Sequence, residues 1–223
     1  MTTTLQSSTV RTPPSRSFSE LKRAVVDFVQ GASDPELLDV AGRSINNAID
    51  EMNVYNWIKL ADKQDFTISV NQADYSIQSN VKDPMGLGLW KDGNPKSKLS
   101  FKEYRTLEEE HPYAVDAGWP TVYTIYYEER VLSLNLLPSQ SFVDNYDTMR
   151  LRFFRRIPHM VDDSQRFGAP SEFSSYVMWQ ARSELATVRG ETRLFSIAEG
   201  KSQTILSRLR NSDHETETDW SEY

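Results

Sequence analysis

The stretch GWPTVYTIYYEERVLSLNLLP, residues 118–138, decides the fold class of this chain. Side chains alternate from one face to the other along 122–127 and again along 132–136, which is the period of a β-strand with one buried face. The charged run at 128–130 separates these segments and predicts a turn, and Pro138 ends the second strand. The stretch is therefore more typical of a structural wall than of an active-site loop.

Other short segments extend this β-rich region in both directions. Residues 149–153 alternate strictly and predict a third strand, so that the three strands form an antiparallel sheet with one apolar face. Residues 66–70 and 75–77 flank a polar turn and predict a further hairpin. Several glycines and prolines in 80–97 predict a long loop, and a capping box at Ser100 predicts a short helix to about residue 110.

Helical periodicity occupies the two ends of the chain. Residues 18–31 and 34–54 each begin with a capping signal and carry apolar side chains at helical spacing. A helix opened by Pro170 runs to Gly190, and an apolar stripe continues over 192–210. Each pair has an apolar face that must be covered. We expect the two pairs to pack together as one helical bundle.

The resulting expectation is an α+β fold with four parts. Residues 18–55 plus 165–210 form the helical bundle, and residues 56–164 form an inserted antiparallel β-rich module. Residues 1–17 are rich in Ser, Thr, Pro and Arg and predict a flexible arm. Residues 211–223 are acidic and predict a mobile C-terminal tail.

Composition excludes several classes of protein. The chain has no cysteine, which rules out disulfides, thiolate zinc sites and cysteine nucleophiles. The formal net charge is -7, so the surface on average repels a phosphate backbone. No apolar run approaches the length of a membrane span, and the N-terminus lacks the apolar core of a secretory signal. We expect no cofactor, no metal and no membrane association.

Candidate chemical groups are few, and each has a simpler structural interpretation. The three histidines, His111, His159 and His214, share no ligand spacing. The acidic runs 108–110 and 162–163 could supply the paired carboxylates of a glycosidase, but solvated helix ends and turns are the favoured interpretation. Four arginines beside Phe153 and Phe154 could contact nucleic acid, but pairing with Glu128, Glu129 or the acidic groups of a neighbouring subunit fits the net charge better. Those arginines are Arg150, Arg152, Arg155 and Arg156.

Several motifs follow one another along the chain: the helical pair opening with FSELK, Tyr-Ser-Ile before a Pro-Gly loop, GWPTVY with its leucine strand closing at Leu-Pro, the strand ending Arg-Ile-Pro, and the final helix led by Pro170. Their order and spacing resemble the head-to-tail adaptor (connector) proteins of tailed bacteriophages, also called head-completion or podovirus tail tubular proteins. The resemblance covers about residues 18–210.

The resemblance implies a structural virion protein, made in the host cytoplasm, that is not an enzyme. It implies a homo-oligomeric ring, usually dodecameric, that docks under the portal protein, extends the DNA channel and provides the platform for a tail tube or nozzle protein. DNA would pass through without sequence-specific binding. The long N-terminal arm and the acidic tail depart from the family pattern and leave open which terminus grips the portal. Two alternatives stay open, a carboxylate-type cell-wall glycosidase and a partner-binding module that forms no ring.

The resemblance also assigns candidate contact residues by region. Candidates for contact with the portal lie in the C-terminal segment: Leu206, Leu209, Arg210, Trp220 and Tyr223. Candidates for the tail-facing edge lie in the predicted loop and the hairpin tip: Leu87, Leu89, Trp90, Glu128, Glu129 and Arg130. The polar face of the third strand supplies candidates for contacts between subunits: Arg150, Arg152 and Arg155.

Overall fold

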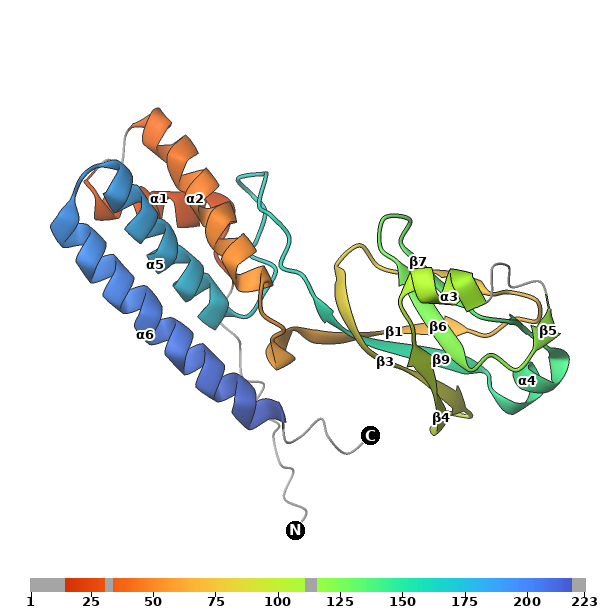
Figure 1. The fold of residues 1–223 in the computed structure, drawn as a ribbon. Helices are drawn as coiled ribbons and strands as arrows, with labels where there is room; N and C mark the ends of the chain where they lie inside the picture. The colour runs from red at the N-terminus through yellow and green to blue at the C-terminus, as the bar shows by residue number, and fades with distance from the viewer. Residues whose placement is uncertain (1–14, 31–33, 111–115, 218–223) are drawn as a thin grey trace, which may run out of the picture. The chain divides into compact units, whose positions relative to one another are not determined.

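The computed structural model describes residues 15–30, 34–110 and 116–217, with side chains described to Asp213 (Figure 1). It confirms the α+β class, with helices at the two ends of the chain and strands in the middle. Contacts divide the chain into two compact units. The helical unit comprises Met1–Tyr55 and Ile157–Tyr223, and the β unit comprises Asn56–Arg156. Residues 157–164, expected in the β-rich module, thus belong to the helical unit.

Four helices build the helical unit: α1 (Phe18–Phe28), α2 (Pro35–Asn53), α5 (Ser171–Val188) and α6 (Thr192–Glu217). The predicted capping box forms at Ser17, whose hydroxyl accepts from the Glu20 amide while the Glu20 carboxylate accepts from the Ser17 amide. Asp34 caps α2 in a similar way, with a Pro in the first turn. Helix α5 contacts each of the other three. Their shared core includes Leu21, Val25, Ile45, Ile49, Phe173, Val177, Leu185 and Ala198.

Two helix ends differ from the sequence-based expectation. Helix α1 ends at Phe28 instead of near residue 31, and Gln30 beyond it takes a left-handed conformation (φ 56°). Gly31 lies outside the described residues. Helix α6 runs on to Glu217 instead of ending near 210, because residues 211–217 contain no Gly or Pro to stop it. Part of the predicted mobile tail is therefore helical, and residues 218–223 lie outside the described part.

The β unit is one seven-stranded sheet in the order β1-β9-β3-β4-β6-β7-β2, with a two-stranded pair β5-β8 beside it. All pairings are antiparallel except β4-β6 and β5-β8, which are parallel. The strands are β1 (Ala61–Thr67), β2 (Asp74–Ser76), β3 (Val81–Lys91), β4 (Asn94–Phe101), β5 (Ala117–Gly118), β6 (Val122–Tyr126), β7 (Val131–Leu134), β8 (Leu137–Pro138) and β9 (Thr148–Arg155). Three short helices complete it: η1 (Ile58–Leu60), α3 (Tyr104–Glu110) and α4 (Gln140–Asn145).

The predicted long loop at 80–97 is wrong, because this segment forms the β3–β4 hairpin. Register shifts in β3 lie next to Pro84 and Gly86, so bulges accommodate residues that would otherwise interrupt a strand. Asp92 and Gly93 make the tight turn with positive φ angles of 51° and 75°. Gly and Pro in this segment therefore shape a hairpin instead of preventing one.

Three further sequence-based details are corrected by the pairing. Strands β1 and β2 do not form a hairpin, since β1 pairs with β9 and β2 pairs with β7. Strand β9 is not a neighbour of β6 or β7. Ser100 does not cap a helix, because it lies in β4 and its amide donates to the Thr121 carbonyl at 2.9 Å; α3 begins at Tyr104. These partners are distant in sequence, so local patterns could not fix them.

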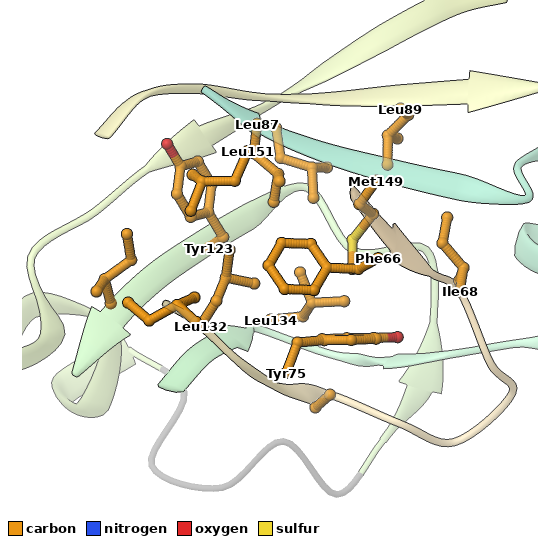
Figure 2. Close-up of a cluster of buried hydrophobic side chains, with 14 of the residues drawn as sticks. Phe66, Ile68, Tyr75, Leu87, Leu89, Tyr123, Leu132, Leu134, Met149 and Leu151 are labelled. Atoms are coloured by element: carbon orange, nitrogen blue, oxygen red, sulfur yellow. The ribbon is translucent and has the colours of Figure 1, made fainter. Parts of the chain in front are cut away.

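The core of the β unit lies where the sheet folds over on itself. Figure 2 shows side chains of β3 and β9 facing those of β6, β7 and β2, with Phe66 of β1 between them. The alternation predicted for β9 is confirmed, since Met149, Leu151 and Phe153 are fully buried. The first and last strands of the unit, β1 and β9, pair side by side, with Ala61 opposite Phe154.

Candidate assembly surfaces

Residues 118–138, the stretch that decided the fold class, include two strands with buried side chains and an exposed tip between them. Tyr123 of β6 and Leu132 and Leu134 of β7 point into the core (Figure 2). Ile125 of β6 is buried as well, so both strands are anchored by burial. The tip at 127–130 is exposed, and Arg130 takes a positive φ of 57° while its carbonyl accepts from the Ile77 amide. Glu128, Glu129 and Arg130 are thus available to a partner, as their candidate role requires.

The Gly-Trp-Pro corner before β6 is held by a buried amide that the sequence interpretation missed. The side-chain oxygen of Asn135 accepts from the amides of Thr121 and Val122 at 3.1 and 3.2 Å, and Asn135 is 5% exposed. Trp119 remains 46% exposed and donates from Nε1 to Ser141 Oγ at 3.0 Å. An Asn in an alternating apolar strand is a signal that could have indicated this bond.

Around Trp119 the aromatic rings support one another. Its ring stands edge-on to Phe142 and Tyr146, with centroids 5.7 and 5.9 Å away. Phe142 is fully buried, so the exposed indole is mounted on the core of the unit. Such a ring loses little freedom when a partner covers it.

A second exposed aromatic group lies at α3 and was not predicted. We call it the α3 aromatic patch: Phe101, Tyr104 and Tyr126. Phe101 is 44% and Tyr104 is 42% exposed. The Tyr104 and Tyr126 rings lie 6.0 Å apart, and Phe101 stacks edge-on against buried Tyr123 at 5.4 Å.

The α3 aromatic patch also carries acidic groups. Tyr126 donates to the Glu108 carboxylate at 3.4 Å, and burial together with this carboxylate raises the pKa of the Tyr126 hydroxyl. Lys102 pairs with Glu110 at the far end of α3. Because Tyr126 is the last residue of β6, the patch adjoins the exposed hairpin tip.

The arginines of β9 do not stand as expected. Arg150 makes a bidentate ion pair with Asp65 of β1, at 2.6 and 2.8 Å, and its guanidinium stacks over the Trp90 ring at 4.1 Å. This pairing lowers the pKa of the Asp65 carboxyl. The expected partner acids at the hairpin tip were therefore wrong for Arg150, which is engaged within its own chain. Arg152 and Arg155 are partly exposed on the same strand.

Four of the candidate contact leucines are buried. Leu87 and Leu89 of β3 are 1% and 2% exposed, and both belong to the core of the β unit (Figure 2). Leu206 and Leu209 are 8% and 3% exposed, because they continue the α6 stripe of Ala198 and Ser202 that faces the helical core. Their candidate roles at a tail-facing edge and at the portal are corrected, since buried side chains present no contact surface.

The remaining candidates have mixed outcomes. Trp90 is half-buried under Arg150 and lies on a strand, not on a loop. Arg210 is exposed and stacks over the Tyr55 ring at 4.7 Å. Trp220 and Tyr223 lie outside the described residues.

Two of the groups considered for catalysis or metal binding have ion-pair partners within the helical unit. His159 contacts Asp50 at 2.7 Å, and Asp163 pairs with Lys22 at 2.5 Å. His111 lies outside the described residues, and so does the side chain of His214. Among the side chains that the structure describes, no cluster of histidine and carboxylate groups could hold a metal ion. No helix in the described ranges is long and apolar enough to cross a membrane.

Exposed aromatic rings that pack against a buried core are typical of protein contact surfaces. The chain matches the family model described as SU10 adaptor protein over residues 16–220. The chain belongs to the SU10 adaptor protein family. The adaptor is accordingly a structural bacteriophage protein and a component of the virion that interacts with phage head and tail components. No curated protein sequence matches this adaptor.

Proposed function

We propose that this adaptor forms a closed ring, expected to be dodecameric, that docks under the portal protein, extends the DNA channel and presents a platform to the tail tube protein. The proposal is supported by the family match, which spans both compact units. The more specific likeness to podovirus tail tubular proteins belongs to the same proposal.

The single observation that carries the tail platform is the α3 aromatic patch with its adjoining hairpin tip. Aromatic rings dominate the energetics of protein interfaces, and those already fixed by ring contacts lose little entropy on binding. Tyr104 and Phe101 meet both conditions, since each is over two-fifths exposed and stacked on another ring. The charged tip at 128–130 would supply the polar rim of that contact.

A ring requires two different faces on each subunit. In a ring, one face of each subunit contacts a different face of the next subunit, and the series of contacts closes on itself. The helical unit offers exposed apolar side chains near the α5–α6 turn: Val188, Phe195 and Ile197. These lie on different elements from the α3 aromatic patch and are free to serve a different neighbour. The net charge of -7 suits a channel along which DNA slides without adhering.

Native mass spectrometry of the chain, alone and mixed with the portal protein of the same phage, tests the proposal. We expect a stoichiometric ring with the portal. Phe101→Ser combined with Tyr104→Ser should leave that ring intact and abolish capture of the tail tube protein. Val161→Ser removes a more exposed apolar side chain (78%) from the helical unit and serves as the matched control. A chain that stays monomeric in the presence of portal would contradict the proposed function.

A further inference from the structure

A hollow on the helical unit has two arginines and one carboxylate in its lining, and a third arginine lies beside it. It has a volume of about 480 Å³ and is lined by Ser15, Arg16, Glu20, Ala24 and Arg166. Arg182 lies beside it, since its guanidinium donates two hydrogen bonds to the carbonyl of Ala24, at 3.1 and 2.7 Å. We call this site the arginine hollow.

Backbone hydrogen bonds hold the segments that carry Arg16 and Arg166 in place around the arginine hollow. Ser17 pairs with Arg166 in an isolated antiparallel bridge. The Phe167 amide donates to the Arg16 carbonyl at 3.0 Å, and the Phe18 amide donates to the Gln165 carbonyl at 2.9 Å. These bonds join the start of α1 to the segment before α5.

None of the three guanidiniums has an ion pair in the described part of the chain. The hydrogen bond of Arg16 goes to the sulfur of Met178, a weak acceptor, and that of Arg166 goes to the carbonyl of Ser15. Arg182 stacks over Trp179 at 4.3 Å and has only the Ala24 carbonyl as acceptor. Burial and the nearby charge of Arg16 lower the pKa of Arg182.

The carboxylate in the lining is already used. Glu20 accepts the Ser17 amide at 2.7 Å as part of the capping box, and this bond is the main reason that the pKa of Glu20 is lowered. Strong charge-assisted acceptors are therefore missing from a place where three strong donors converge. An acidic segment of protein would supply them.

The chain itself carries such a segment at its C-terminal end. Residues 211–223 read NSDHETETDWSEY, with carboxylates at Asp213, Glu215, Glu217, Asp219 and Glu222. The last residues of α6 include the first three of these. We propose that the arginine hollow binds the acidic C-terminal segment of a neighbouring copy of the same chain.

The segment would have to be almost fully extended to reach the hollow of its own chain. Helix α6 has 26 residues and its antiparallel neighbour α5 has 18, so α6 overhangs the start of α5 by about 12 Å. Met178, which Arg16 contacts, lies roughly 10 Å further along α5. Residues 218–223 span about 20–22 Å when fully extended, which only just matches the roughly 22 Å required along the helix axis alone. A neighbouring copy in the ring can present its segment without this full extension.

This inference rests on the proposed ring, which places copies next to one another, and it replaces the portal contact expected of the C-terminal segment. It can be tested without the portal. A fluorescently labelled peptide of residues 211–223 is titrated into the full-length chain at a concentration where mass photometry shows monomers. We expect saturable binding that weakens as salt increases.

Arg16→Gln combined with Arg166→Gln should weaken the affinity for the peptide by roughly tenfold or more, because two charge-assisted hydrogen bonds are lost. Arg189→Gln combined with Arg193→Gln is the control, since it removes the same charge from exposed positions at the α5–α6 turn. Circular dichroism checks that both variants fold. Arg166→Glu should recover binding to a peptide in which lysines replace Glu215 and Glu217.

Absence of peptide binding, or equal loss in both double variants, overturns the inference. Tighter binding of the peptide to the portal than to the chain also overturns it. Peptide binding by a chain that forms no ring with its portal would refute the proposed function and leave the arginine hollow as an acidic-peptide site. If the chain forms a ring with the portal, the ring is unchanged by Arg16→Gln and Arg166→Gln, and the peptide does not bind, then the proposed function stands and the inference about the arginine hollow is refuted.

Discussion

Replacing Arg150 with Gln should weaken the fold of the β unit and leave assembly of the subunits unchanged. Its bidentate pair with Asp65 is half in water, since the Asp65 side chain is 45% exposed, so the pair contributes about 1 kcal/mol after screening. Stacking of the guanidinium over Trp90 adds roughly 0.5–1 kcal/mol. The expected loss in free energy of unfolding is therefore about 1.5–2 kcal/mol.

Urea unfolding measures this loss, because urea does not screen charges as guanidinium does. Tryptophan fluorescence is a suitable signal, since Trp90 is part of the contact. Arg155→Gln is the matched control: it lies near the end of the same strand and has no side-chain hydrogen bond or ion pair among the described residues. A double-mutant cycle with Asp65→Asn isolates the ion pair from the stacking.

The pH dependence of the free energy of unfolding offers an independent check on the same ion pair. Arg150 lowers the pKa of Asp65 in the folded chain, so the pair stabilises the fold above the unfolded pKa and loses this contribution as pH falls through the folded pKa. The difference between wild type and Arg150→Gln should be full at neutral pH and shrink below about pH 4. If Arg150→Gln unfolds like Arg155→Gln but prevents ring formation, Arg150 is a contact between subunits and the reasoning is refuted.

Three other predictions concern the β unit. Gly88→Ala would place a Cβ 3.1 Å from Trp90 Nε1 and should cost about 1 kcal/mol in urea unfolding, while Gly86→Ala, with open space around its Cβ, should cost much less; equal costs would contradict this geometry. Asn135→Ala leaves two backbone amides at the Gly-Trp-Pro corner unpaired and should lower the free energy of unfolding by roughly 2–3 kcal/mol, and a loss near zero would show that water replaces the side chain. Burial raises the pKa of Tyr123 to about 12. In an ultraviolet pH titration, the difference in phenolate absorbance between wild type and Tyr123→Phe near pH 11 should therefore be smaller than one exposed tyrosine would give.

Local patterns in the sequence predicted the elements better than they predicted the neighbours. The capping box at Ser17 and the alternation of Met149, Leu151 and Phe153 each depend on residues a few positions apart, and both formed as expected. Pairing of β1 with β9 joins residues that are far apart along the chain. Nothing in either strand alone specifies that register, because many alternating strands could match it.

Exposure was the harder property to predict, and the candidate surface residues show why. Leu206 and Leu209 share the helical spacing of the α6 core stripe, so the sequence already held the signal that they are buried. Phe101 and Tyr104 carry no such signal: their exposure depends on where α3 packs after β4 ends. The arginine hollow likewise needs Arg16, Arg166 and Arg182 to converge from three separate segments.

The pairing of β1 with β9 has a mechanical consequence. The chain leaves the helical unit into β1 and returns to it from β9, and these two strands lie side by side in one sheet. Tension between the helical unit and anything attached to the β unit is therefore divided between two covalent connections that are pulled in the same direction. Neither strand has to slide past the other under such a load, so the hydrogen bonds between them are spared. An adaptor that interacts with both head and tail components would benefit from this division of force.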